Sequence, residues 1–257
     1  MKKTIININP YTFQISLKDN IFALGSCFSN EISNYIMKNG FNTVSNPFGT
    51  IYNTYSIYKS IKTIYDNNFD RNNIGFENKT YFSYYHSTEF DGNNIDIVMD
   101  KIYNINNSSH DRLVKSNIFI ITLGTSVVYK YKKNNEIVAN CHKLPTDYFE
   151  KTVLSLSENI HYLNEIIKII KNIDKNNKIV FTLSPIRHNP ENLSENSYSK
   201  SILRAAIENV INNLDIIYFP SYEIVLDQLR DYKYYKNDGV HINNKAINII
   251  MNKFGEI

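Results

Sequence analysis

The stretch that decides the fold lies near the N-terminus and reads Ile21-Phe22-Ala23-Leu24-Gly25-Ser26-Cys27-Phe28. Four consecutive apolar residues closed by a glycine predict a short buried strand. Beyond the turn, Ile32, Ile36 and Phe41 follow helical spacing, and Gly40 is placed for a helix C-cap. The sequence therefore predicts a strand, a tight turn and a helix over residues 21–40.

The same alternation of strand and helix continues along the chain. Residues 117–124 form the strongest predicted strand, and their continuous apolar run is typical of a strand buried on both faces. Further strands are predicted at residues 178–183 and 216–219, with another possible strand at 96–99. Helices are predicted at residues 54–65, 156–172, 198–212, 222–229 and 243–253. This order favours an α/β fold with a parallel sheet and right-handed crossovers.

Length and composition suit one globular domain. The chain has 257 residues, of which 42% are hydrophobic and 21% charged. No Gly/Ser or Pro-rich linker divides it, so a single domain over residues 1–257 is predicted. Residues 68–94 are polar and irregular and are interpreted as an insertion, and residues 127–139 as a small hairpin.

Several functional classes are disfavoured by the composition. The net charge is only +3 and the lysines are scattered, which does not favour a nucleic-acid partner. No apolar run approaches the roughly 20 residues of a membrane helix, and no apolar signal core follows the N-terminal lysines. A cytoplasmic location is therefore expected, and with only two cysteines, no disulfide. The oligomeric state is left open.

The distinctive motifs fall at the ends of the predicted strands. In open α/β sheets, ligands bind outside the carboxyl ends of the strands. The motifs found there are Gly25-Ser26-Cys27-Phe28, Gly124-Thr125-Ser126, Ser184-Pro185-Ile186-Arg187-His188, Pro220-Ser221-Tyr222-Glu223 and Asp238-Gly239-Val240-His241. Their convergence predicts a site at this edge of the sheet.

Cys27 and Ser26 are the candidate nucleophiles. Both would lie at a helix N-terminus, where exposed N–H groups and the helix dipole favour an anion. A thiol there is expected to have a lowered pKa, and the same N–H groups could hold an oxyanion. The alternative interpretation is that Cys27 is a small buried residue that closes the turn.

Asp238 and His241 are the candidate base pair. They stand three residues apart, directly before the last predicted helix, so a turn can place both side chains on one side. His241 would then act as general base, with Asp238 orienting it. The alternative is an Asp238 that caps a turn beside a surface histidine.

The remaining histidines are less distinctive. His86, His142 and His188 could each line a pocket, or each could be an ordinary hydrogen-bonded side chain. A zinc site would have to draw on four scattered side chains: Cys27, Cys141, His142 and His241. Because these residues lack the usual Cys-x-x-Cys or His-x-x-x-His spacing, no metal is expected.

Ordered motifs over residues 20–250 resemble the GSCFA domain family. Gly25-Ser26-Cys27-Phe28-Ser29 is similar to the signature of that family, with Ser29 in place of the usual Ala. The further similar blocks are Asn46-Pro47-Phe48-Gly49, Tyr52-Asn53, Tyr85-His86-Ser87, Thr122-Leu123-Gly124-Thr125, Asn140-Cys141-His142-Lys143, Leu183-Ser184-Pro185-Ile186-Arg187-His188, Ser199-Lys200, Tyr218-Phe219-Pro220-Ser221-Tyr222-Glu223, Leu229-Arg230-Asp231-Tyr232 and Asp238-Gly239-Val240-His241.

The family is placed near the SGNH hydrolases, and this resemblance implies a flavodoxin-like three-layer fold with a late Asp-x-x-His. On the usual Gly-Asp-Ser opening, Cys27 takes the nucleophile position and Ser26 that of the Asp. Oxyanion donors are implied at Gly49 and at the loop of Gly124 and Thr125. That loop lacks the usual oxyanion Asn.

The resemblance implies an acyl esterase or acyltransferase that acts on an acylated small molecule or glycan. The residues expected to contact substrate are His86, Cys141, His142, Arg187 and His188. A similar Gly-Asn-Cys-Gln pattern in an acetyltransferase family favours a thiol nucleophile. No cofactor is expected, although acyl-CoA would be a co-substrate of a transferase.

Two alternatives remain. One is a ligand-binding protein that keeps the pocket without the reaction, which the missing Gly-Asp-Ser opening suggests. The other is a partner-binding protein that uses the aromatic stretch 81–90.

Overall fold

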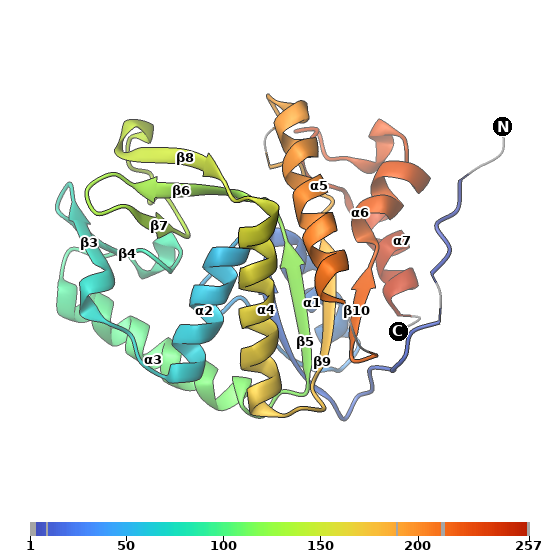
Figure 1. The fold of residues 1–257 in the computed structure, drawn as a ribbon, viewed down its shortest axis with the longest axis horizontal. Coiled ribbons are helices and arrows are strands. Elements are labelled where there is room, and N and C mark those ends of the chain that lie inside the picture. Colours follow the sequence, from blue (N-terminus) through green and yellow to red (C-terminus); the bar gives the residue numbers. More distant parts are fainter. Residues whose placement is uncertain (1–3, 9, 189, 212–213, 256–257) are drawn as a thin grey trace.

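A five-stranded parallel sheet forms the centre of the computed structural model, which describes residues 4–8, 10–188, 190–211 and 214–255 (Figure 1). Its strands lie in the order β10-β9-β5-β1-β2, and every neighbouring pair is parallel. Their bounds are β1 (Asn20–Gly25), β2 (Asn42–Ser45), β5 (Ile118–Leu123), β9 (Lys178–Leu183) and β10 (Ile216–Phe219). The predicted parallel α/β fold is confirmed.

Helices cover both faces of this sheet and make it the middle of three layers. Their bounds are α1 (Cys27–Lys38), α2 (Thr54–Asp66), α3 (Ile95–Leu113), α4 (Leu156–Ile173), α5 (Leu193–Val210), α6 (Ser221–Glu223) and α7 (Asn244–Phe254). The predicted helix 198–212 begins earlier, at Leu193, and its residue 212 lies outside the described residues. A π-helical turn, η4 (Ile224–Gln228), follows α6.

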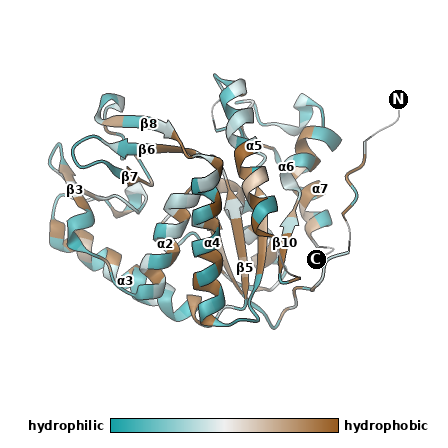
Figure 2. Cartoon of the chain, viewed as in Figure 1, coloured by the Kyte–Doolittle hydropathy of each residue, from teal (hydrophilic) through white to brown (hydrophobic). Residues whose placement is uncertain are grey.

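Two hydrophobic clusters lie on opposite faces because side chains alternate along each strand. Phe22 and Leu24 of β1 pack in the cluster that includes α2, α4 and α5. Ile21 and Ala23 pack in the other cluster, with α1, α7 and η4. All six residues of β5 are buried, as predicted for a strand covered on both faces. Figure 2 shows hydrophobic colour on this strand and hydrophilic colour on the outer face of α4.

The strand order places a topological switch point at the end of β1. When the five strands of the central sheet are numbered 1 to 5 along the chain, their order in the sheet is 2-1-3-4-5, which is the flavodoxin-like arrangement. β1 is flanked by β2 and by β5, so connections leave β1 and β5 toward opposite faces of the sheet. Ligands bind at such switch points, which here lie beside Ser26 and Gly124.

A smaller region lies at one end of the sheet (Figure 1). It holds the hairpin β3 (Ile74–Glu77) and β4 (Thr80–Ser83) and a sheet in the order β7-β6-β8. The bounds of the latter strands are β6 (Val127–Tyr131), β7 (Glu136–Val138) and β8 (Phe149–Val153). The third strand, β8, was not predicted because Phe149-Glu150-Lys151-Thr152-Val153 has charged residues in its middle.

The possible strand at residues 96–99 is wrong, because these residues belong to α3. The helix begins where the Asn94 side chain accepts hydrogen bonds from the N–H groups of Asp96 and Ile97. Val98, Ile102 and Leu113 then form a buried helical stripe, broken only by polar residues that the sequence pattern obscured. Within the described residues, no helix is both long and apolar enough to cross a membrane.

The turn after β1 depends on close backbone contact. Gly25 has φ +137°, and a Cβ at this position would overlap the carbonyl oxygen of Thr122. The Gly25 N–H donates to Asn46 Oδ1 (2.8 Å), and the Ser26 N–H donates to the Thr122 carbonyl (3.0 Å). The absence of a side chain at Gly25 therefore allows β1 to end against β5.

We expect Gly25→Ala to destabilise the fold far more than Gly40→Ala. Both glycines have positive φ, but a Cβ on Gly40 meets only the end of the Leu17 side chain, at 3.7 Å. Gly40→Ala should cost about 1 kcal/mol of strain, and Gly25→Ala more than about 3 kcal/mol because backbone must move. Chemical denaturation measures both values. Equal losses would contradict the assigned role of the close contact.

Candidate active site

Ser26 and Cys27 lie side by side at the start of α1 but differ in exposure. Ser26 is the N-cap residue and is fully buried. Its hydroxyl has no hydrogen-bond partner among the described residues. Cys27 is the first residue of the helix, and its side chain is only partly buried. Cys27 is therefore more exposed than Ser26, whose hydroxyl is closed off from solvent.

The pKa of the Cys27 thiol is raised from its usual value, chiefly because burial penalises the thiolate. The N–H groups of Cys27 and Phe28 and the charge of Lys200 lower it, and Glu31 adds to the increase. The N–H groups at the helix N-terminus thus lower the pKa of Cys27 as predicted, but the prediction that this pKa is lowered overall is wrong. Burial outweighs the donors, so the resting group is a thiol.

Asp238 and His241 form the predicted pair. Asp238 Oδ2 lies 2.8 Å from His241 Nδ1, so Nδ1 carries the hydrogen and Nε2 is left as the proton acceptor. The other oxygen, Oδ1, accepts the N–H groups of His241 (2.9 Å) and Val240 (2.8 Å). These bonds lower the pKa of Asp238 to about 2, so the carboxylate stays ionised.

Arg187 holds the turn that carries this pair. Its guanidinium lies over the Tyr235 ring, with 4.6 Å between the guanidinium carbon and the ring centroid. Nη1 donates to the Gly239 carbonyl at 3.4 Å, and the Arg187 N–H donates to the Val240 carbonyl at the same distance. The predicted substrate contact of Arg187 is untested, and the observed contacts give it a positioning role.

His241 does not reach the candidate nucleophiles in this conformation. Within the described residues, no hydrogen bond joins it to Cys27 or Ser26. Burial lowers the pKa of His188 to about 3, and the charges of Lys200 and His241 add to this effect. Cys27 begins the helix after β1, and Lys200 donates to the Ser184 carbonyl after β9. The Arg187 N–H joins the turn of His241 to the loop after β9, so these residues lie along the same edge of the sheet.

The implied oxyanion donors are already engaged. The Gly49 N–H donates to the Asn46 carbonyl (2.8 Å). The N–H groups of Gly124 (2.7 Å) and Thr125 (3.0 Å) both donate to the Tyr52 carbonyl. Their role as oxyanion donors stays a prediction and requires these bonds to open. The N–H groups of Cys27 and Phe28 already act on the sulfur at the start of α1.

His86 and His142 lie in the smaller region. His86 is fully buried, its Nδ1 is 2.7 Å from Ser83 Oγ, and burial lowers its pKa to about 3. His142 Nδ1 lies 2.9 Å from a carboxylate oxygen of Asp91. Neither histidine lines the cavity that Tyr52 and Cys141 line, so the predicted substrate contacts of His86 and His142 have no support in this conformation. Their observed contacts are those of buried structural side chains.

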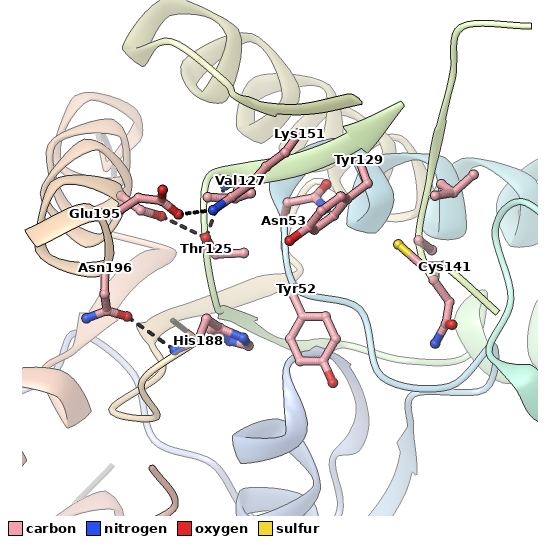
Figure 3. Close-up of a pocket in the computed structure, with 14 residues that line it drawn as sticks. Tyr52, Asn53, Thr125, Val127, Tyr129, Cys141, Lys151, His188, Glu195 and Asn196 are labelled. Atoms are coloured by element: carbon pink, nitrogen blue, oxygen red, sulfur yellow. Dashed lines mark hydrogen bonds and ion pairs between the residues drawn. The ribbon is translucent and has the colours of Figure 1, made fainter. Parts of the chain in front are cut away.

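A cavity of about 440 Å³ opens beside this edge (Figure 3). Half of its lining residues carry an amide or a hydroxyl, and Lys151 and Glu195 form an ion pair there. The lining residues are Tyr52, Asn53, Thr125, Val127, Tyr129, Val138, Ala139, Asn140, Cys141, Lys151, His188, Glu195, Asn196 and Ser199. Of the predicted site residues, Thr125, Cys141 and His188 line it.

The thiol of Cys141 in this cavity has a pKa raised to about 11, and burial is the cause. Across the part of the chain that the structure describes, no three His, Cys, Asp or Glu side chains gather in a way that could hold a metal ion.

Lys200 is the main site residue that the sequence reasoning missed. Its ammonium is fully buried and donates to the Ser184 carbonyl at 2.6 Å, at the end of β9. Burial lowers its pKa to about 7. The available sequence signal was helical spacing. Lys200 lies three residues before Leu203 and seven before Ile207, on the buried stripe of α5.

The comparisons with known proteins match one family and several distant solved structures. A sequence model of the GSCFA family matches residues 20–254. A search of curated proteins finds no match. Three of the similar solved structures are 9–11% identical to this chain. One is a protein from Streptococcus pneumonia described as a candidate platelet activating factor (11% identity, 92% of this chain, 83% of that chain, TM-score 0.46).

The other two are esterases. A mutant acetyl esterase with acetate ion has 10% identity, a TM-score of 0.44, and coverage of 91% of this chain and 93% of that chain. A carbohydrate esterase family 3 protein from Talaromyces cellulolyticus has 9% identity with the same coverage and TM-score.

We expect the stability of the protein to rise between pH 7 and pH 10 because of Lys200. The group has a pKa of about 7 in the folded state and an ordinary, higher pKa when unfolded. The unfolded chain therefore binds more protons across this window, and raising the pH favours folding. The free-energy cost of burying the charged lysine is fully present below pH 7. It decreases as the pH rises toward the pKa of Lys200 in the unfolded chain.

Lys200→Met removes this contribution. Between pH 7 and pH 10, the free energy of unfolding of wild type should rise by on the order of 4 kcal/mol more than that of the variant. Urea denaturation at several pH values measures the difference. Lys168→Met, on an exposed part of α4, is the control and should track wild type. A difference between wild type and Lys200→Met that stays constant from pH 7 to 10 would contradict the lowered pKa of Lys200.

Proposed function

This chain belongs to the GSCFA family, and we propose that it is an acyl esterase or acyltransferase with Cys27 as nucleophile. The observation that carries the proposal is the hydrogen-bonded pair of Asp238 and His241 at the same sheet edge as the Cys27 thiol. A carboxylate–imidazole pair beside an accessible thiol is the arrangement that nucleophilic acyl transfer needs.

The chemistry proceeds in two steps. His241 Nε2 takes the proton of the Cys27 thiol, the sulfur attacks the acyl carbon, and the alcohol leaves with the proton from His241. The product is a thioester on Cys27. Water or an acceptor hydroxyl, deprotonated by His241, then attacks that thioester and releases the acid or the new ester. Because the thiol is protonated at rest, the base is essential.

Exposure supports Cys27 over Ser26 as the nucleophile. Ser26 is fully buried, whereas the Cys27 side chain is partly open to solvent. In addition, the N–H groups of Cys27 and Phe28 act on the sulfur, where they would also face an oxyanion formed on an attacked carbonyl.

The cavity lining supports a polar, hydroxyl-rich substrate. Asn53, Asn140 and Asn196 offer amides that both donate and accept, and Tyr52 and Tyr129 offer rings with hydroxyls. These are groups that bind sugar hydroxyls and stack on sugar rings. We therefore propose an acylated small molecule or glycan as substrate, with no cofactor and with acyl-CoA as donor if the reaction is transfer.

One observation favours a second function, a ligand-binding protein without catalysis. The N–H groups of Gly49, Gly124 and Thr125 are bonded within the chain, and His241 makes no hydrogen bond to Cys27 among the described residues. Mass spectrometry after incubation with acyl donors separates the two functions. An acyl group trapped on Cys27 excludes simple binding, whereas tight binding without it supports the second function.

We expect wild type to hydrolyse p-nitrophenyl acetate or to transfer an acetyl group from acetyl-CoA. Cys27→Ala should lower kcat/KM about a thousandfold because no thioester can form. Ser26→Ala, at the neighbouring buried position, should keep most of the activity. His241→Ala should lower it by about a hundredfold or more.

Asp238→Asn should lower kcat because the amide no longer favours the reactive tautomer of His241. His161→Ala, an exposed histidine on α4, is the control and should not change the rates. An inactive wild type, or full activity in Cys27→Ala or His241→Ala, would refute the proposal.

A further inference from the structure

We infer that the cavity binds an uncharged sugar against the small sheet β7-β6-β8, and that the ion pair of Lys151 and Glu195 selects against charged ligands. The inference deepens the proposed function and rests on it only for the acyl group that the sugar carries. Lys151 and Glu195 have no part in the proposed chemistry, because they lie outside the Asp238–His241 pair and the turn of Cys27.

The first support is a row of side chains across the small sheet. Tyr129 on β6 pairs with Val138 on β7 and with Lys151 on β8. Paired residues of antiparallel strands point to the same face of a sheet, and all three of these residues line the cavity. Tyr129 is 39% exposed, so its ring is open to a ligand. The row therefore forms an apolar and aromatic wall that ends in an ammonium group.

The second support is the opposite wall of the cavity, which the three-layer fold supplies. Glu195, Asn196 and Ser199 of α5 line this side. Tyr52 and His188 line it from two loops, and their rings meet edge to face with 4.6 Å between the centroids. The His188 N–H donates to Asn196 Oδ1 at 3.2 Å. A ligand in the cavity therefore contacts both the small sheet and the three-layer fold.

The ion pair joins these two walls. Lys151 Nζ donates to Glu195 Oε1, which ties β8 to the first turn of α5 (Figure 3). Both side chains are partly exposed, and such a pair contributes little to stability. Its atoms can serve hydroxyl groups instead, because the ammonium donates and the carboxylate accepts. An aromatic wall beside such groups suits a sugar, whose ring has apolar faces and a hydroxyl-bearing edge.

The charge of the lining indicates that this sugar is neutral. Within the described lining of the cavity, Lys151 and Glu195 are the two charged side chains, and their charges cancel. Burial lowers the pKa of His188 to about 3 and raises that of Cys141 to about 11, so both are neutral. An ionised ligand group would lose its water here without gaining an uncompensated opposite charge, which is unfavourable. A phosphate-bearing acyl donor would therefore bind outside this cavity.

The test is the affinity of the wild-type protein for three methyl glycosides at pH 6. Methyl glucoside is neutral, methyl glucuronide is anionic, and the methyl glycoside of glucosamine is cationic. These probes carry no acyl group, so binding is measured without turnover. Titration followed by NMR gives the three Kd values. We expect the neutral probe to bind about tenfold more tightly than either charged probe.

Charge variants should reverse this preference with opposite signs. Glu195→Gln leaves a net positive charge in the lining and should tighten binding of the anionic probe about tenfold. Lys151→Met leaves a net negative charge and should do the same for the cationic probe. Lys62→Met is the matched control, because it removes an exposed ion pair with Asp66 on α2, away from the lining. It should leave all three affinities unchanged.

The aromatic wall is tested with the neutral probe. Tyr129→Ala should weaken its binding about tenfold because the ring that stacks on the sugar is lost, and Tyr129→Phe should retain it. Tyr103→Ala, which removes an exposed tyrosine on α3, should not change the affinity.

Equal affinities of wild type for the three probes, a preference for a charged probe, or no binding of any probe would overturn the inference and leave the chemistry at Cys27 standing. Charge variants that rank the probes as wild type does would also overturn it. Selective binding of the neutral probe by a protein that turns over no ester would support the inference and count against the proposed reaction.

Discussion

The close contact between Gly25 and the carbonyl of Thr122 is the constraint on which the candidate site depends. It lets the end of β1 lie against β5 and directs the next two residues in opposite senses, Ser26 into the core and Cys27 toward the edge. In the same turn, the Gly25 carbonyl accepts a hydrogen bond from the Ile51 N–H, and the Gly25 N–H donates to Asn46 Oδ1. Three segments distant in the sequence therefore meet at the turn that precedes Cys27.

The site has a buried part and a solvent-exposed part. Lys200 is buried, Cys27 and His188 are partly buried, and burial shifts the pKa of each in the direction that favours its neutral form. Asp238, in contrast, is exposed and has its pKa lowered by backbone hydrogen bonds. A charge in the buried part is costly unless a group of opposite charge is also there, whereas a surface ion pair is screened by water.

The sequence predicted the central sheet because its strands are continuous apolar runs, and it predicted the Asp238–His241 pair because a short turn joins the two residues. It failed for α3, whose apolar stripe is diluted by asparagine and serine, and for β8. The place of Lys200 on the apolar stripe of α5 was a signal of its burial. The hydrogen bonds of Lys200 to Ser184, and of Gly124 and Thr125 to Tyr52, join segments distant in the sequence, and no local pattern encodes them. Occupied oxyanion donors and the raised pKa of Cys27 are likewise consequences of packing.

A reaction at Cys27 requires a change of conformation, and the contacts indicate where. His241 must approach the sulfur, yet its turn is held by Arg187 on Tyr235 and by the hydrogen bonds of Gly239 and Val240. The two bonds to Gly239 and Val240 are long, 3.4 Å each, and Gly239 has positive φ with open space around it. Within the turn the bonds are shorter, because the Lys236 N–H donates to the His241 carbonyl at 2.7 Å and the Gly239 N–H donates to the Lys236 carbonyl at 3.0 Å. An approach of His241 to the sulfur on substrate binding would therefore break the long Arg187 bonds before the turn itself changes.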